Sequence, residues 1–149
     1  MTDAARQVEA LLYTYAERID RGDFDGVAKL FAHGRIHAVP DAPPDAVYEG
    51  QAAVRGLYEG ATRLYDDGTP KTKHTTTNAI IDVDEAAGVA SARSYYTVTQ
   101  ATDELPLQII ITGRYHDSFQ RLDDTWWFDT RVMFVDQTGD LSHHLQFEL

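Results

Sequence analysis

The stretch KTKHTTTNAIIDV, residues 71–83, marks the point where the hydrophobic pattern of the chain changes from a helical period to a strand period. From here onward, β-branched and aromatic residues form long runs separated by short turn signals. The pattern predicts four strands, at Thr72–Val83, Gly88–Thr99, Leu105–Leu122 and Thr125–Val135. Because the connections are short, we expect neighbouring strands to pair antiparallel in a meander.

Upstream of this stretch the apolar residues recur at steps of three and four, as they do on one side of an amphipathic helix. The pattern predicts a first helix over Asp3–Ile19 and a second, shorter helix capped by Asp23. A third helix is expected over Gln51–Tyr65. Between the second and third helices, Arg35–Val39 indicates a short strand, and the proline-rich residues 40–45 indicate a loop.

Helices followed by long strands are typical of an α+β domain and not of repeated β-α-β units. With 149 residues and no repeat or linker, the chain is expected to form one domain over residues 1–149. The sequence leaves the structure of the last residues, 140–149, open. A long twisted sheet with helices on one side curls around them, so we expect a pocket in the concavity.

Composition excludes several classes of function. The chain has no cysteine, which rules out disulfides, thiolate metal sites and thiol nucleophiles. Its formal net charge of −11 opposes binding to nucleic acid and to anionic membranes. There is no long apolar run or secretory signal, so a cytoplasmic location is expected. Phosphate-loop, dinucleotide and serine-elbow motifs are absent, and we expect no cofactor.

Asp20 and His74 are the first candidates for chemistry. Asp20 lies in the last turn of the first helix, where the helix dipole disfavours a negative charge, although a simple turn role is the alternative. His74 lies at an unusually polar strand start, and strand alternation places it on one face with Thr76 and Asn78. That face either lines a pocket or meets water.

Arg131 is the third candidate, because it lies in the most apolar of the four strands. A guanidinium in such a run must reach solvent, pair with a carboxylate or face a pocket. Alternation places Arg131 on one face with Trp127, Asp129 and Met133, so Asp129 is the expected structural partner.

The remaining histidines do not form a metal site by their spacing. His143 and His144 are adjacent, so on an extended chain they point in opposite directions and cannot chelate one ion together. Gly34 separates His33 from His37 and spoils the helical spacing of a metal pair. His116 neighbours Tyr115 and Asp117 on a strand and is a candidate secondary pocket residue. We predict no metal.

The order of these elements resembles the SnoaL-like family of the nuclear transport factor 2-like superfamily, and within it the scytalone dehydratase and dehydrochlorinase branch. The resemblance rests on YTYAERIDRGDF at residues 13–24, the turn at Gly50, HTTTN at residues 74–78, Trp126 and Arg131. It implies a curved, mainly antiparallel sheet wrapped around the N-terminal helices, a cystatin-like α+β roll.

The resemblance also implies a site. It places Asp20 and His74 as an acid-base dyad, with Arg131 stabilising negative charge on a leaving group or an enolate oxygen. The implied activity is that of a cofactor-independent lyase, or less directly an isomerase or cyclase, acting on a small hydrophobic cyclic molecule. The expected substrate-binding residues are four tyrosines that orient a carbonyl or hydroxyl group and three further pocket residues: Tyr15, Tyr48, Tyr58, Tyr115, Asn78, His116 and Met133.

A non-catalytic role remains the alternative: a small-ligand binding protein, or an assembly partner resembling the small subunit of an oxygenase. In either case, apolar residues on both sides of the sheet, such as Tyr95 and Tyr96, suggest a homo-oligomer built face to face. We expect a homodimer or a homotrimer.

Overall fold

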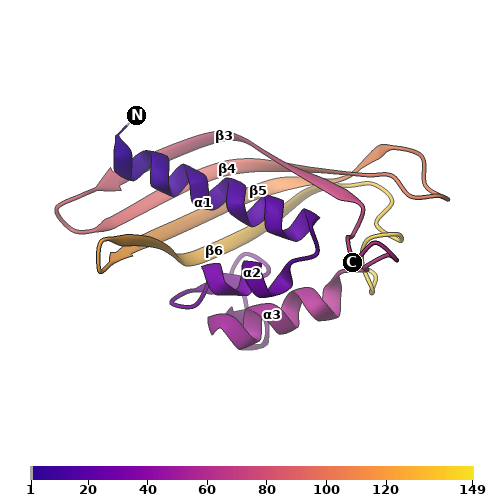
Figure 1. Ribbon diagram of the computed structural model, residues 1–149, viewed down its shortest axis with the longest axis horizontal. Helices are drawn as coiled ribbons and strands as arrows, with labels where there is room; N and C mark the ends of the chain where they lie inside the picture. The colour runs from indigo at the N-terminus through magenta and orange to yellow at the C-terminus, as the bar shows by residue number, and fades with distance from the viewer. Residues whose placement is uncertain (1) are drawn as a thin grey trace.

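The structure is a computed structural model that describes residues 2–149, and it contains three helices packed on one face of a curved sheet (Figure 1). No helix in this range is long and apolar enough to cross a bilayer. The helices are α1 (Asp3–Asp20), α2 (Phe24–Leu30) and α3 (Gly50–Ala61), with a 3₁₀ turn at Pro44–Ala46. The strands are β1 (Arg35–His37), β2 (Val47–Glu49), β3 (Thr72–Asp84), β4 (Val89–Gln100), β5 (Gln108–Leu122) and β6 (Thr125–Thr138).

The sheet has the order β2-β1-β6-β5-β4-β3. The four long strands form the predicted antiparallel meander. The short strand β1 pairs parallel with β6 and antiparallel with β2, so the sheet is mixed and not closed. The α+β class and the segregation of helices to one face are therefore confirmed.

Helix α1 lies across the concave face of the sheet and contacts β3 and β6 (Figure 1). The predicted apolar stripe is Val8, Leu11, Leu12, Tyr15 and Ile19, and all of these residues except the partly buried Leu11 are buried. The Asp23 side chain accepts a hydrogen bond from the Gly26 amide at 2.9 Å and so caps α2 as predicted. The cap begins α2 directly after the turn that ends α1.

The third helix is four residues shorter than its predicted C-terminal limit. It ends at Ala61, and Thr62 takes an extended conformation. Thr62 forms a β-bridge with Leu145, and the Gln146 amide donates to the carbonyl of Ala61 at 2.9 Å. Residues 141–149, which we call the C-terminal segment, thus occupy the position that another helical turn would need. Sequence periodicity could not reveal a competitor so distant in the chain.

A β-bulge changes the faces of β3. The pairing register with β4 shifts between Thr77 and Ile80, and Asn78 has a φ of 56°. Beyond the bulge the alternation is reversed, so Asn78 is exposed while Ala79 is turned inward. The prediction that Asn78 shares a face with His74 and Thr76 was therefore wrong.

A second register shift changes the faces of β6. It lies opposite Ser118 and Phe119 of β5, so the inward residues are Trp126 and Phe128 before it and Arg131 after it. The predicted grouping of Arg131 with Trp127 and Asp129 was wrong for this reason. An alternation rule cannot locate an extra residue in a strand.

We predict that Gly22→Ala destabilises the fold, because Gly22 forms the turn between α1 and α2 with a φ of 71°. A Cβ atom there would lie 2.0 Å from the carbonyl oxygen of Gly68. The strained backbone alone should lower the free energy of unfolding by about 2 kcal/mol, measured by urea denaturation. As a control, Gly56→Ala on α3, where a Cβ meets nothing within 4 Å, should be neutral or stabilise by up to about 1 kcal/mol. Equal effects at both glycines would contradict this account.

Candidate active site

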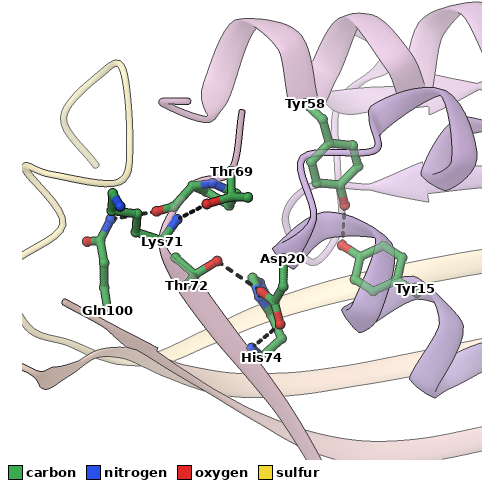
Figure 2. Close-up of polar contacts among 9 residues, drawn as sticks. Tyr15, Asp20, Tyr58, Thr69, Lys71, Thr72, His74 and Gln100 are labelled. Atoms are coloured by element: carbon green, nitrogen blue, oxygen red, sulfur yellow. Dashed lines mark hydrogen bonds and ion pairs between the residues drawn. The ribbon is translucent and has the colours of Figure 1, made fainter. Parts of the chain in front are cut away.

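Asp20 and His74 are directly hydrogen-bonded. Asp20 is the last residue of α1, and its Oδ1 atom lies 2.6 Å from Nδ1 of His74 (Figure 2). The other carboxylate oxygen accepts the backbone N–H of His74 at 2.8 Å. The Thr72 hydroxyl also donates to Oδ1, at 2.9 Å. The side chains of His74 and Asp20 are only 9% and 12% exposed, so water competes little for these bonds.

These bonds explain why a carboxylate ends a helix where the dipole disfavours it. Donors from the start of β3, not the local turn, satisfy the Asp20 side chain. Because the carboxylate accepts from Nδ1, that nitrogen carries the hydrogen in the neutral ring. The Nε2 atom of His74 then holds the lone pair and is the atom able to take up a proton.

His74 lines a cavity between α1, α3, the concave face of the sheet and the C-terminal segment. The cavity has a volume of about 190 Å³. Its polar lining consists mainly of Tyr15, Tyr58, Thr62, His74, Tyr115 and His144. Its apolar lining includes Leu57, Ile111, Met133, Leu141, Leu145 and Phe147. Since a dry apolar cavity of about 150 Å³ can hold benzene, this one has room for a single substituted ring.

Two tyrosine hydroxyls meet in the cavity wall. The hydroxyl of Tyr15 on α1 is hydrogen-bonded to that of Tyr58 on α3 (Figure 2). Burial raises the pKa of both phenols, that of Tyr58 well above its usual value, although the nearby Arg131 cation opposes the rise. Both are therefore neutral at physiological pH. Since one hydroxyl donates to the other, one phenolic proton remains free for a ligand.

Arg131 lies behind the tyrosines and not at the cavity surface. It is fully buried, and its Nε and Nη2 atoms donate to the Asp117 carboxylate at 2.8 and 3.0 Å. Its guanidinium carbon is 3.6 Å from the ring centroid of Tyr115 and 4.2 Å from that of Tyr15. The predicted partner, Asp129, instead accepts from Ser118. Arg131 thus supports the tyrosines and is not placed to touch a ligand directly.

The Arg131–Asp117 pair is charged although it is buried. Burial by itself would lower the pKa of Arg131, but the carboxylate reverses the effect and the pKa stays above its ordinary value. Burial raises the pKa of Asp117, and the guanidinium offsets part of that rise. We treat both groups as ionised at neutral pH, because the guanidinium keeps its proton and the two hydrogen bonds hold the carboxylate against it.

The structure separates the remaining predicted residues into two groups. Tyr115 and Met133 line the cavity with His74. Tyr48 lies on β2 opposite Ile36 and does not line it. Asn78 and His116 border a groove on the convex face of the sheet, so the structure does not bring them to the cavity. Among residues 2–149, no three histidine or carboxylate side chains are grouped so as to hold a metal ion.

His144 is a cavity residue that the sequence analysis missed. Its ring centroid is 6.4 Å from that of His74, and the residue is 8% exposed. Burial, with a smaller contribution from His74, lowers the pKa of His144 to about 4. The alternation argument assumed an extended chain, but residues 142–144 form a turn, so it could not show which of the two adjacent histidines faces the cavity.

Comparison with known proteins identifies the class. Residues 1–132 match the SnoaL-like domain, and the chain belongs to that family. No curated protein matches the sequence. A Mycobacterium tuberculosis protein of unknown function is 26% identical, with 89% of this chain and 71% of that chain covered and a TM-score of 0.71.

Two structures from Novosphingobium aromaticivorans are also similar. A proposed scytalone dehydratase is 26% identical, with 91% of this chain and 85% of that chain covered and a TM-score of 0.70. A nuclear transport factor 2-like protein with a cystatin-like fold is 19% identical, with 87% and 80% covered and a TM-score of 0.70. The predicted family and fold are therefore confirmed.

We predict that Asp117→Asn lowers the free energy of unfolding by about 3–5 kcal/mol, because it leaves the guanidinium of Arg131 buried without a counter-charge. Urea denaturation measures the loss. The control is Asp136→Asn, which breaks the exposed pair between Asp136 and Arg114 and should change stability little. If the two variants were equally stable, the buried pair would not have the structural importance that we assign to it.

We also predict that His144 makes the fold acid-sensitive. Its folded pKa of about 4 lies below its ordinary value of 6.5, so between these values the unfolded chain binds more protons and stability falls as the pH falls. The loss from pH 7 to pH 4 due to this residue should reach about 3 kcal/mol. Urea denaturation at both pH values should show that His144→Phe loses less stability than the unaltered protein. An identical pH dependence in both would refute the prediction.

Proposed function

We propose that this protein is a cofactor-independent enzyme that removes a proton from a small hydrophobic cyclic molecule. The single observation that carries the proposal is the bond between Asp20 and Nδ1 of His74, because it leaves Nε2 free as a base beside a ring-sized cavity. The 26% identity to a proposed scytalone dehydratase favours a lyase over the other activities of such domains. An isomerase or cyclase would use the same first step.

In the proposed step, Nε2 of His74 takes a proton from a carbon next to a carbonyl group. The C–H bond breaks, an N–H bond forms, and the electron pair moves onto the carbonyl oxygen as an enolate. Asp20 stabilises the positive charge that the imidazole acquires and keeps the ring in its orientation. Collapse of the enolate then breaks the C–O bond of a hydroxyl group on the next carbon, and that group leaves as water with the proton from Nε2 of His74. In an isomerase, Nε2 instead returns the proton at another position.

The tyrosine pair is suited to hold the developing negative charge. Neutral phenols are hydrogen-bond donors, and the pair formed by Tyr15 and Tyr58 lines the same cavity as His74. The guanidinium carbon of Arg131 lies 4.2 Å from the ring centroid of Tyr15. Its positive charge favours electron density on the phenolic oxygen. In this proposal Arg131 acts through the tyrosines, which replaces the direct contact with a leaving group expected from the resemblance.

The apolar residues of the cavity are the reason why we propose a hydrophobic ring as the substrate. Met133, Ile111 and Leu57 offer no hydrogen bonds, so an apolar part of a ligand is favoured there by removal from water. The polar side chains of Tyr15, Tyr58 and His74 belong to the same lining and are available to orient the polar part of the ligand.

The test uses 3-hydroxycyclohexanone, a single ring that can both exchange its acidic C–H for deuterium and lose water to give cyclohexenone. NMR in D₂O follows both reactions. His74→Ala should lower the rates by about 10²–10⁴. Asp20→Asn should be impaired as well, because an amide can present the wrong hydrogen-bonding atom to Nδ1.

The control is His116→Ala, which removes a histidine on the opposite face of the sheet and should keep the rate of the unaltered protein. If His74→Ala and His116→Ala react equally fast, the dyad is not the base. A protein that binds cyclic ketones without exchanging their protons supports the alternative, a non-catalytic ligand-binding protein. The expected homo-oligomer stays a prediction, and the exposed Tyr95 and Ile80 on the convex face are consistent with it.

A further inference from the structure

The C-terminal segment carries His144 into the cavity and is firmly attached there. The carbonyl of His144 accepts the amide of Arg63 at 2.8 Å, and the amide of His144 donates to the carbonyl of Leu141 at 3.0 Å. The preceding carbonyl, that of His143, accepts hydrogen bonds from Gln100 and Tyr65. The position of the His144 ring is therefore set by backbone bonds on both sides. It also lies beyond residues 1–132, the range that matches the family.

One ring nitrogen of His144 has no hydrogen-bond partner among the described residues. This atom, Nδ1, is buried. A buried polar atom without a hydrogen-bond partner lowers the free energy of unfolding by about 1–3 kcal/mol. Such an atom in a folded protein therefore calls for an explanation, such as a bound ligand. His74 cannot supply the bond through its own Nδ1, because that atom is engaged with Asp20.

The chemistry of this ring selects the kind of group that can bind it. The low pKa of His144 keeps the imidazole neutral, so one nitrogen donates and the other accepts a hydrogen bond. A hydroxyl or carbonyl oxygen matches such a ring. A carboxylate is a poorer match, because none of the described residues that line the cavity is a cation and Arg131 is paired with Asp117.

We propose that His144 is a substrate-binding residue that hydrogen-bonds an oxygen substituent of an uncharged ring compound. With 6.4 Å between the ring centroids of His144 and His74, one small ligand can contact both imidazoles. The oxygen substituent bound by His144 is then attached to a ring atom near the carbon that faces His74. This inference rests on the proposed function only in taking the cavity as the substrate site.

The test uses 4-fluorophenol and fluorobenzene, two unreactive rings that differ in one hydroxyl group. Titration followed by ¹⁹F NMR should show about fivefold to tenfold tighter binding of 4-fluorophenol, the advantage of one net hydrogen bond. His144→Phe should lose this preference. The matched control, His143→Phe, changes the adjacent histidine, which does not line the cavity, and should keep it.

A second measurement does not depend on any variant folding. In the unaltered protein, ¹⁵N NMR of the histidine rings should show the His144 nitrogens shifting with 4-fluorophenol and remaining unchanged with fluorobenzene. A preference that persists in His144→Phe, or a shift at His74 alone, would overturn the proposal.

The two proposals can fail separately. Binding of 4-fluorophenol requires no reaction, so the preference for the hydroxyl group is expected whether or not the unaltered protein exchanges deuterium on the cyclic ketone. Preference without exchange in the unaltered protein would overturn the proposed function and leave the assignment of His144 intact. Deuterium exchange on the ketone without a preference for 4-fluorophenol would support the proposed function and overturn the assignment of His144.

Discussion

The structure depends on the attachment of one carboxylate, that of Asp20, to the first residues of β3. Three hydrogen bonds from Thr72 and His74 join the end of α1 to the edge strand of the sheet. They place a negative charge beside an imidazole in a setting where water competes little. The same bonds set the tautomer of His74, so one interaction both holds α1 on the sheet beside the cavity and leaves Nε2 without a hydrogen, as the proposed proton transfer requires.

A buried ion pair provides the second constraint. Removing two charges from water is unfavourable, and a pair such as Arg131 and Asp117 is seldom the most stable filling of a core. Here the guanidinium carbon lies over the rings of both Tyr15 and Tyr115. A hydrophobic substitute would fill the space but would remove the positive charge behind the phenols. We therefore interpret the pair as a support for the tyrosines.

The cavity is completed from the far end of the chain. The C-terminal segment ends α3 early, pairs with Thr62 and brings His144 to the same wall as His74. Asp20 and His74 lie within the family match, residues 1–132, and His144 lies outside it. In the two proposals, the dyad transfers the proton and the docked segment selects the ligand.

The sequence by itself determined the α+β class, the meander and the buried stripe of α1, and it marked Asp20 and His74 as candidates that only the family resemblance joined into a pair. These follow from hydrophobic period, turn residues and a charge placed against a helix dipole, all of which act over a few neighbouring residues. Tertiary structure alone decided the bulges that turn Asn78 outward and pair Arg131 with Asp117, and the docking that buries His144. Each of these depends on contacts between segments distant in the chain, where the free energy of packing overrides the local pattern.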